Sequence, residues 1–141
     1  MVSDEEQFNA LLGELRVLES TYNEFTMRIN FLERALTEAR SALDTIKDLG
    51  SESQGDVLIP VGAGLLLRGT PPQSDKILVN VGANVVLEKS RNDAASILEK
   101  RIEEFEQNMI AVATQRNQIA QRLEADRRAL QAVATRQVPQ K

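Results

Sequence analysis

The middle of this 141-residue chain reads Val57-Leu-Ile-Pro-Val-Gly-Ala-Gly-Leu-Leu-Leu67 and, twenty residues later, Ile77-Leu-Val-Asn-Val-Gly-Ala-Asn-Val-Val-Leu87, with five of the eleven positions identical. Each copy consists of an apolar run, a Gly-Ala turn whose residues tolerate positive φ, and a second apolar run. This is the pattern of a β-hairpin. The repeat therefore predicts two β-hairpins in succession, joined by a loop over residues 68–75.

The predicted strands are apolar at nearly every position instead of alternating between apolar and polar. Only Arg68, Asp75 and Lys76 are charged between Val57 and Leu87. Strands of this kind need cover on both faces, and one short chain cannot supply it, so we expect them to pair with and pack on other chains. The predicted oligomerisation residues are Val57, Leu58, Ile59, Val61, Leu65, Leu66, Leu67, Ile77, Leu78, Val79, Val81, Val85, Val86 and Leu87.

Proline distinguishes the first hairpin from the second. Pro60 has no N–H, so its strand is expected to have an edge or a bulge there, whereas Asn80 at the matching position carries no such expectation. This difference predicts different neighbours for the two hairpins.

The segment before the hairpins fits a heptad pattern, in which apolar residues at positions a and d form one stripe along a helix. Ser3 and Glu6 have the spacing of a capping box at its start. The a positions are Phe8, Leu15, Tyr22, Ile29, Leu36 and Leu43, and the d positions are Leu11, Leu18, Phe25, Leu32, Ala39 and Ile46.

The segment after the hairpins repeats the heptad pattern, with Ser90 placed to cap its start. Ten of its twelve seam positions are apolar; the exceptions are Arg116 at a, interpreted as a register-setting residue, and Asp126 at d. The a positions are Ala95, Ile102, Met109, Arg116, Leu123 and Leu130, and the d positions are Leu98, Phe105, Val112, Ile119, Asp126 and Val133.

Both predicted helices meet the same short central segment, so they should pair antiparallel, with Ile29 opposite Val112. The expected fold class is α+β: a long antiparallel two-helix coiled coil joined by two β-hairpins through which the chain assembles with other chains. The predicted domains are an N-terminal coiled-coil helix (1–49), the hairpins (50–89) and a C-terminal coiled-coil helix (90–141).

Composition excludes several classes of function. Without Cys or His, the chain has no histidine base, no thiol nucleophile and no zinc-finger ligands. Lys+Arg 17 against Asp+Glu 21 gives a net charge of −4, which disfavours nucleic acid and anionic membranes as partners. We expect no enzyme activity, no cofactor and no metal.

The N-terminus and the hydropathy pattern bear on localisation. Met1-Val-Ser-Asp-Glu-Glu6 is acidic and has neither the basic nor the apolar region of a signal peptide. The longest nearly apolar stretch, residues 57–67, is far shorter than a membrane-spanning helix. We therefore expect a cytoplasmic protein without a membrane span.

The order of heptad helix, two apolar hairpins and returning heptad helix resembles the alpha class of prefoldin subunits, in an archaeal form. The most specific segment is Lys76-Ile-Leu-Val-Asn-Val-Gly-Ala-Asn-Val-Val-Leu-Glu-Lys89, which is similar to the family's second hairpin. The resemblance implies a hexamer of two alpha and four beta subunits built on a β-barrel platform. It also implies an ATP-independent holdase that captures unfolded polypeptides and delivers them to a group II chaperonin.

The resemblance further implies that clients bind at the coiled-coil tips. We expect the last two heptads to fray, because Gly13 weakens the first helix, Asp126 places a charge in the seam, and Leu12 and Val17 are apolar off the seam. By position, the client-binding tip residues are Phe8, Leu11, Leu12, Leu15, Leu130 and Val133.

Two alternatives remain open from the sequence. The chain could be a structural coiled-coil scaffold that docks folded partners, which binding of denatured chains would distinguish from a holdase. Met27 and Phe31 lie one turn apart off the seam, and they fit either a client-facing wall or isolated exposed side chains.

Overall fold

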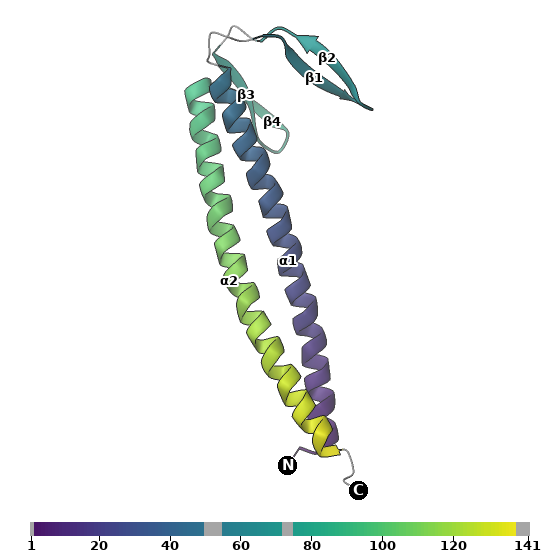
Figure 1. The fold of residues 1–141 in the computed structure, drawn as a ribbon. Helices are drawn as coiled ribbons and strands as arrows, with labels where there is room; N and C mark the ends of the chain where they lie inside the picture. The colour runs from purple at the N-terminus through teal and green to yellow at the C-terminus, as the bar shows by residue number, and fades with distance from the viewer. Residues whose placement is uncertain (1, 50–54, 72–74, 138–141) are drawn as a thin grey trace. The chain divides into compact units, whose positions relative to one another are not determined.

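The computed structural model describes residues 2–49, 55–71 and 75–137 and contains two long helices and four short strands (Figure 1). The described residues form two compact units, one of residues up to Arg34 with those from Phe105 onward, the other of residues 35–104. The element order confirms the predicted α+β fold of two helices joined by two hairpins. The elements are α1 (Asp4–Asp48), β1 (Val57–Gly62), β2 (Leu65–Gly69), β3 (Lys76–Gly82), β4 (Val85–Ser90) and α2 (Arg91–Gln137).

Both helices begin with the predicted caps. The Ser3 hydroxyl accepts a hydrogen bond from the Glu6 backbone N–H at 3.2 Å, and a Glu6 carboxylate oxygen accepts one from the Ser3 N–H at 3.3 Å. At the start of α2, the Ser90 hydroxyl accepts a hydrogen bond from the Asp93 N–H at 3.1 Å. These bonds satisfy backbone donors that the first turn of a helix leaves unpaired.

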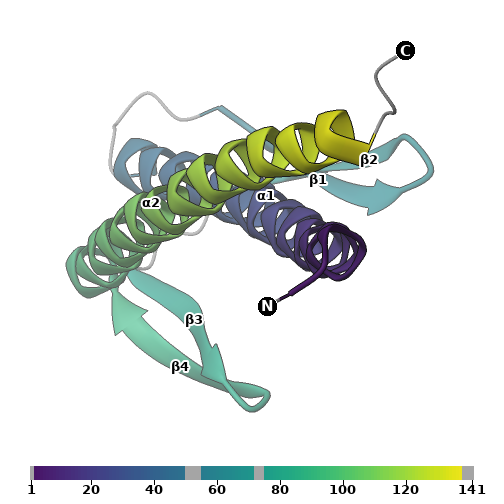
Figure 2. The same cartoon turned by 90° about the horizontal axis from the view of Figure 1, so that it is seen from below.

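In the first unit, α1 and α2 pack antiparallel along the predicted seam (Figure 1; Figure 2 views them from below). Ile29, Leu32 and Val112 form a buried cluster, and Phe25, Phe105, Met109 and Ala113 pack against it. This cluster confirms the predicted register of Ile29 and Val112. Every seam position of this unit is buried or half-buried, including Arg116 and Asp126.

In the second unit, the predicted seam residues are also buried or half-buried. Leu36 and Ala39 are buried, and the remaining seam residues, from Leu43 to Ile102, are half-buried. Ala94, next to the predicted seam residue Ala95, is buried as well. The apolar side chains of the seam are thus covered inside one chain along all twelve predicted heptads.

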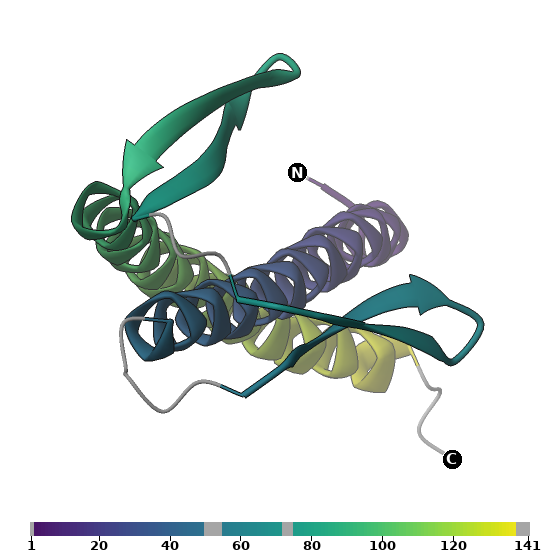
Figure 3. The same cartoon turned by 90° about the horizontal axis from the view of Figure 1, so that it is seen from above.

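The hairpins are two separate two-stranded antiparallel sheets, β1–β2 (hairpin 1) and β3–β4 (hairpin 2), seen as two ribbons in Figure 3. Each turns through two residues with positive φ, Ala63 and Gly64 in hairpin 1 and Ala83 and Asn84 in hairpin 2. Such two-residue turns match the twist of the strands they join. The predicted Gly-Ala turns are confirmed.

A β-bulge interrupts the register of both hairpins, which corrects the expected contrast between them. The bulge predicted near Pro60 is present, between Pro60 and Gly62, but a matching shift lies between Asn80 and Gly82. The shared cause is glycine: Gly62 and Gly82 have φ of 109° and 107°, a conformation that L side chains rarely adopt. Asn80 also accepts a hydrogen bond from the Gly82 N–H through its side-chain oxygen at 2.9 Å.

The register also corrects the expectation that both hairpins are apolar on both faces. Paired residues share a face and neighbours alternate, so hairpin 1 carries apolar side chains on either face, with Arg68 as its one charged residue. In hairpin 2 the polar residues Lys76, Asn80 and Glu88 lie on the same face, together with Leu78 and Val86. The other face of hairpin 2 carries Ile77, Val79, Val85, Leu87 and the stem of Lys89.

Candidate functional site

The largest group of exposed apolar side chains lies on the hairpins. Eleven of the fourteen predicted oligomerisation residues are exposed, with fractions from 42% at Leu87 to 71% at Leu78. Val57, Ile77 and Val79 are half-buried. Apolar surface of this extent on contiguous strands is typical of a protein–protein interface. The exposed residues are Leu58, Ile59, Val61, Leu65, Leu66, Leu67, Leu78, Val81, Val85, Val86 and Leu87.

Three polar contacts involve hairpin 2 or the residues next to it. The Arg101 guanidinium on α2 donates a hydrogen bond to the Asn80 carbonyl, at the bulge, over 2.9 Å. Lys76 and Glu88 form an exposed ion pair across the strands at 3.6 Å, and Arg91 pairs with Asp75 at 3.1 Å. The Arg101 contact was not predicted, since no short-range pattern links two residues 21 apart.

The second candidate site is the distal coil, defined as residues 4–18 of α1 and 119–136 of α2. The structure brings all six predicted tip residues into this region, with the two helices paired. Leu15 is 6% exposed and Val133 only 1%, whereas Phe8, Leu11, Leu12 and Leu130 are half-buried. In this paired conformation their apolar surface is largely covered.

Two interhelical ion pairs flank the distal seam. Arg122 donates to one carboxylate oxygen of Glu14 at 3.0 and 2.6 Å, and Arg127 pairs with Glu19 at 3.4 Å. Sequence reasoning did not identify these pairs. The heptad register contained the signal, because the members of each pair share position g or position e, which face each other in an antiparallel coil.

Two polar side chains occupy the seam itself. The Arg116 guanidinium lies 5.6 Å from the centre of the Tyr22 ring and donates a hydrogen bond to the Thr26 hydroxyl at 3.4 Å. These contacts agree with a stem that packs in the seam and a head that reaches a polar partner. Asp126 is different: it is 7% exposed, and one of its carboxylate oxygens has no hydrogen-bond partner in the described structure.

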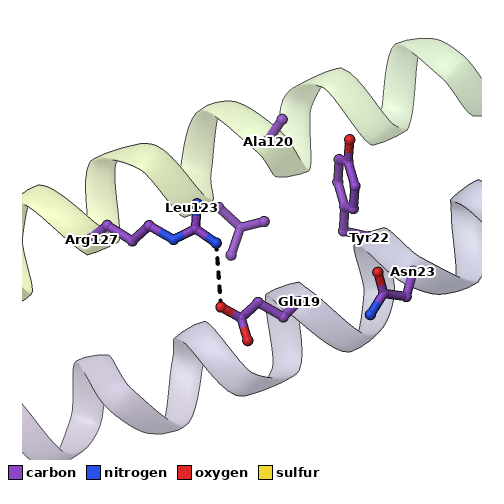
Figure 4. Close-up of a pocket in the computed structure, with 6 residues that line it drawn as sticks. All are labelled: Glu19, Tyr22, Asn23, Ala120, Leu123 and Arg127. Atoms are coloured by element: carbon purple, nitrogen blue, oxygen red, sulfur yellow. Dashed lines mark hydrogen bonds and ion pairs between the residues drawn. The ribbon is translucent and has the colours of Figure 1, made fainter.

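A pocket of about 450 Å³ opens between the helices next to the Glu19–Arg127 ion pair (Figure 4). Its wall combines this pair with the Tyr22 ring, the Asn23 amide and the buried side chain of Leu123. The lining contains no nucleophile–base pair. Among the described residues, no group of three or more carboxylates is placed to hold a metal ion.

Other exposed apolar side chains lie along the coil outside the seam. Met27 and Phe31 are exposed as predicted, and Ile110, which sequence reasoning did not single out, is exposed as well. Phe31 borders a groove of about 310 Å³ whose floor is formed by Leu32 and Val112. Across the ranges that the structure describes, neither helix is apolar enough over a sufficient length to cross a membrane.

Comparisons with known sequences point to one family. A family model described as Prefoldin subunit matches residues 18–136. The prefoldin subunit alpha of Nitrosopumilus maritimus is 32% identical over 85% of this chain and 83% of its own length. The prefoldin subunit alpha of Methanoculleus marisnigri is 34% identical, over 79% of this chain and 85% of its own length.

Comparisons with solved structures support the fold. Filamentous PFD from Methanocaldococcus jannaschii, solved by cryo-electron microscopy, matches with a TM-score of 0.67 and 21% identity, over 83% of this chain and 95% of that one. The crystal structure of the prefoldin beta subunit from Thermococcus strain KS-1 matches with a TM-score of 0.63 and 19% identity, over 99% of this chain and 100% of that one.

Proposed function

Because the chain belongs to the prefoldin family, as an alpha-class chaperone subunit, we propose that it works as an ATP-independent holdase. In this proposal the hairpins join the chain to other prefoldin subunits, and the distal coils of the assembly capture unfolded polypeptides. The captured clients pass to a group II chaperonin in the cytoplasm. Neither a cofactor nor a metal takes part.

The observation that carries the proposal is the exposed apolar surface of the hairpins. An isolated two-stranded hairpin is marginally stable in water, and hairpin 1 has apolar side chains on both faces. Edge pairing and face packing with other chains would satisfy its backbone groups and cover its side chains together. The proposed partners are a second alpha subunit and four beta-class subunits.

The length of the coil supports a capture role for its distal end. At 1.5 Å per residue, the 45 residues of α1 span roughly 68 Å. Several such arms on one platform would hold an unfolded chain at many weak apolar contacts, so that avidity retains the client while each contact still releases.

A light-scattering assay tests the proposal. A chemically denatured model protein is diluted into the assembled complex without nucleotide, and its aggregation is followed over time. The test variant replaces Phe8, Leu11 and Leu130 with Gln, and the matched control replaces Ile110 with Gln, because Ile110 is an exposed apolar residue outside the tips.

We expect the wild-type complex and the control to suppress aggregation, and the tip variant to suppress it less. Equal suppression by the tip variant and the control would contradict capture at the tips. No suppression by the correctly assembled wild-type complex would contradict the holdase proposal and favour a scaffold that docks folded partners.

A further inference from the structure

Hairpin 2 is joined to α2 at its base without a linker. β4 ends at Ser90 and α2 begins at Arg91. The Arg91 backbone N–H donates a hydrogen bond to the Asp75 carbonyl at 2.9 Å, and the Arg91 guanidinium pairs with the Asp75 carboxylate at 3.1 Å. These contacts hold the residue before β3 against the first turn of α2. An attachment at the base alone, however, would let the rest of the hairpin pivot.

A second contact joins the same two elements farther from the base. Arg101 Nη2 on α2 donates a hydrogen bond to the Asn80 carbonyl of β3 at 2.9 Å, within the unit of residues 35–104. Asn80 lies roughly 17 Å beyond Asp75 along an extended strand, and Arg101 lies roughly 15 Å beyond Arg91 along a helix. Because the two contacts are this far apart, together they fix the direction of hairpin 2 relative to α2.

The acceptor of this second bond is itself held in place by its own hairpin. Asn80 pairs with Val86 across the strands, beside the β-bulge. Its side-chain oxygen accepts a hydrogen bond from the Gly82 N–H at 2.9 Å. A hydrogen bond from a charged guanidinium is also stronger than one between neutral groups. Arg101 therefore holds a well-defined point of the hairpin and not a loose one.

The direction of hairpin 2 matters because its two faces differ. One face is apolar, and the other includes the ion pair of Lys76 and Glu88. A second subunit would cover the apolar face and leave the charged face to solvent. A hairpin that is held in one direction presents its apolar face without first losing orientational freedom, which lowers the free-energy cost of association.

We propose that Arg101 is a positioning residue, whose bond to the Asn80 carbonyl fixes the direction in which hairpin 2 leaves α2, so that the chain offers this hairpin to other subunits already oriented. The anchoring consists of contacts inside one chain and does not depend on what the protein binds. Its benefit for assembly rests on the proposed function.

Spin-label distances within the full-length chain test the anchoring. The chain contains no cysteine, so Ala83→Cys at the turn of hairpin 2 and Glu104→Cys on α2 give two unique labels at exposed positions. Double electron–electron resonance measures the distribution of the distance between them, with the labelled chain diluted into unlabelled chain. Arg101→Ala removes the donor, and Lys100→Ala is the matched control, because Lys100 is the neighbouring, exposed cation of α2.

We expect a narrow distance distribution in the wild-type background and in Lys100→Ala, and a broader one in Arg101→Ala. Circular dichroism checks that the helical content is unchanged. If the alanine variant fails to fold, Arg101→Lys decides the result, because it keeps the charge but loses the forked guanidinium, and it should also broaden the distribution. A broad distribution in the wild-type background would overturn the proposal. Equal widths with and without the Arg101 substitution would overturn it too, as would the same broadening in Lys100→Ala.

Assembly with beta-class subunits then tests the benefit of the anchoring. On dilution, followed by mass photometry, the Arg101→Ala complex should dissociate at a roughly threefold to tenfold higher concentration than the wild type or Lys100→Ala. A broader distance distribution with unchanged dissociation would confirm the anchoring and overturn its benefit for assembly. Failure of the wild-type chain to assemble at all would contradict the proposed function, and the distance measurements would still decide the anchoring.

Discussion

The apolar side chains of the coil seam are buried within the chain, whereas most of those on the hairpins are exposed. Along the seam, Leu15, Ile29, Leu36 and Val112 are buried by the partner helix of the same chain. On the hairpins, residues of the same chemical type remain exposed on strands that pair only within each hairpin. The apolar seam of the coil is therefore covered within one chain, whereas the apolar side chains of the hairpins need other chains to cover them.

The largest effect is expected where a charge enters the hairpin interface. Val79→Asp or Val86→Asp should break the assembly while leaving helical content intact, because an unpaired charge buried between chains costs about 3–5 kcal/mol. Size-exclusion chromatography with light scattering measures the mass, and circular dichroism measures the helix. Val17→Asp is the control, since Val17 is an exposed apolar residue of the coil. Retention of the full assembly mass by both hairpin variants would contradict the account.

Truncating a seam side chain in the coil is expected to have a smaller effect. It should lower the free energy of unfolding and leave the assembly intact. Leu32→Ala removes a buried side chain from the central cluster and should lower the free energy of unfolding by about 2–5 kcal/mol. The neighbouring Phe31→Ala should change it by less than about 0.5 kcal/mol, because Phe31 is 62% exposed. Denaturant unfolding followed by circular dichroism compares the two, and similar losses would argue against the assigned seam.

Replacing a glycine with alanine should destabilise hairpin 2 but stabilise the coil. Gly82→Ala forces a side chain into a φ of 107° and should cost about 1–3 kcal/mol in hairpin stability. Gly13→Ala lies on an open face of α1, where no atom would contact the added methyl group, and should stabilise the helix by about 1 kcal/mol. Thermal melting of the assembly measures both variants, and a stabilising Gly82→Ala would show that the turn geometry is wrong.

The smallest effect is expected at the exposed ion pair between Glu19 and Arg127. Both side chains are more than half exposed, so Arg127→Gln should destabilise the coil by no more than about 0.5 kcal/mol, with a loss that shrinks at high salt. Thermal melts at low and high ionic strength test this. A loss as large as that of Leu32→Ala would mean that charge, and not the apolar seam, holds the helices together.

Much of the fold could be predicted because periodicity encodes it directly. Heptad spacing identified a seam whose members, from Phe8 to Val133, all lie buried or half-buried between the helices. The two Gly-Ala turns identified both hairpins, since the backbone there needs positive φ.

The sequence predictions for the hairpins were wrong where they were drawn from single residues without the pairing register of the strands. Pro60 was expected to give a bulge to the first hairpin alone, yet hairpin 2 has the same bulge between Asn80 and Gly82, while the prediction of different neighbours for the two hairpins stays a prediction. The polar face of hairpin 2 was missed because Lys76 and Glu88 lie on different strands, and they share a face only when the strands are paired in register.

The candidate site was harder to predict from the sequence than the fold was. Apolar residues at heptad spacing look the same whether they only hold the helices together or also open to bind clients. The heptad pattern placed Asp126 in the seam, and the structure adds that one of its buried oxygens has no hydrogen-bond partner among the described residues, which no sequence pattern contains.

Hydrogen exchange of the hairpins in the assembled wild-type protein tests the central contrast most directly. If other chains cover them, the strand amides of residues 57–69 and 76–90 should be protected as strongly as the helix amides around Ile29 and Val112, although an isolated hairpin is only marginally stable. Near-unprotected exchange in both hairpins beside a well-protected coil would contradict the claim that the hairpins are completed by other chains.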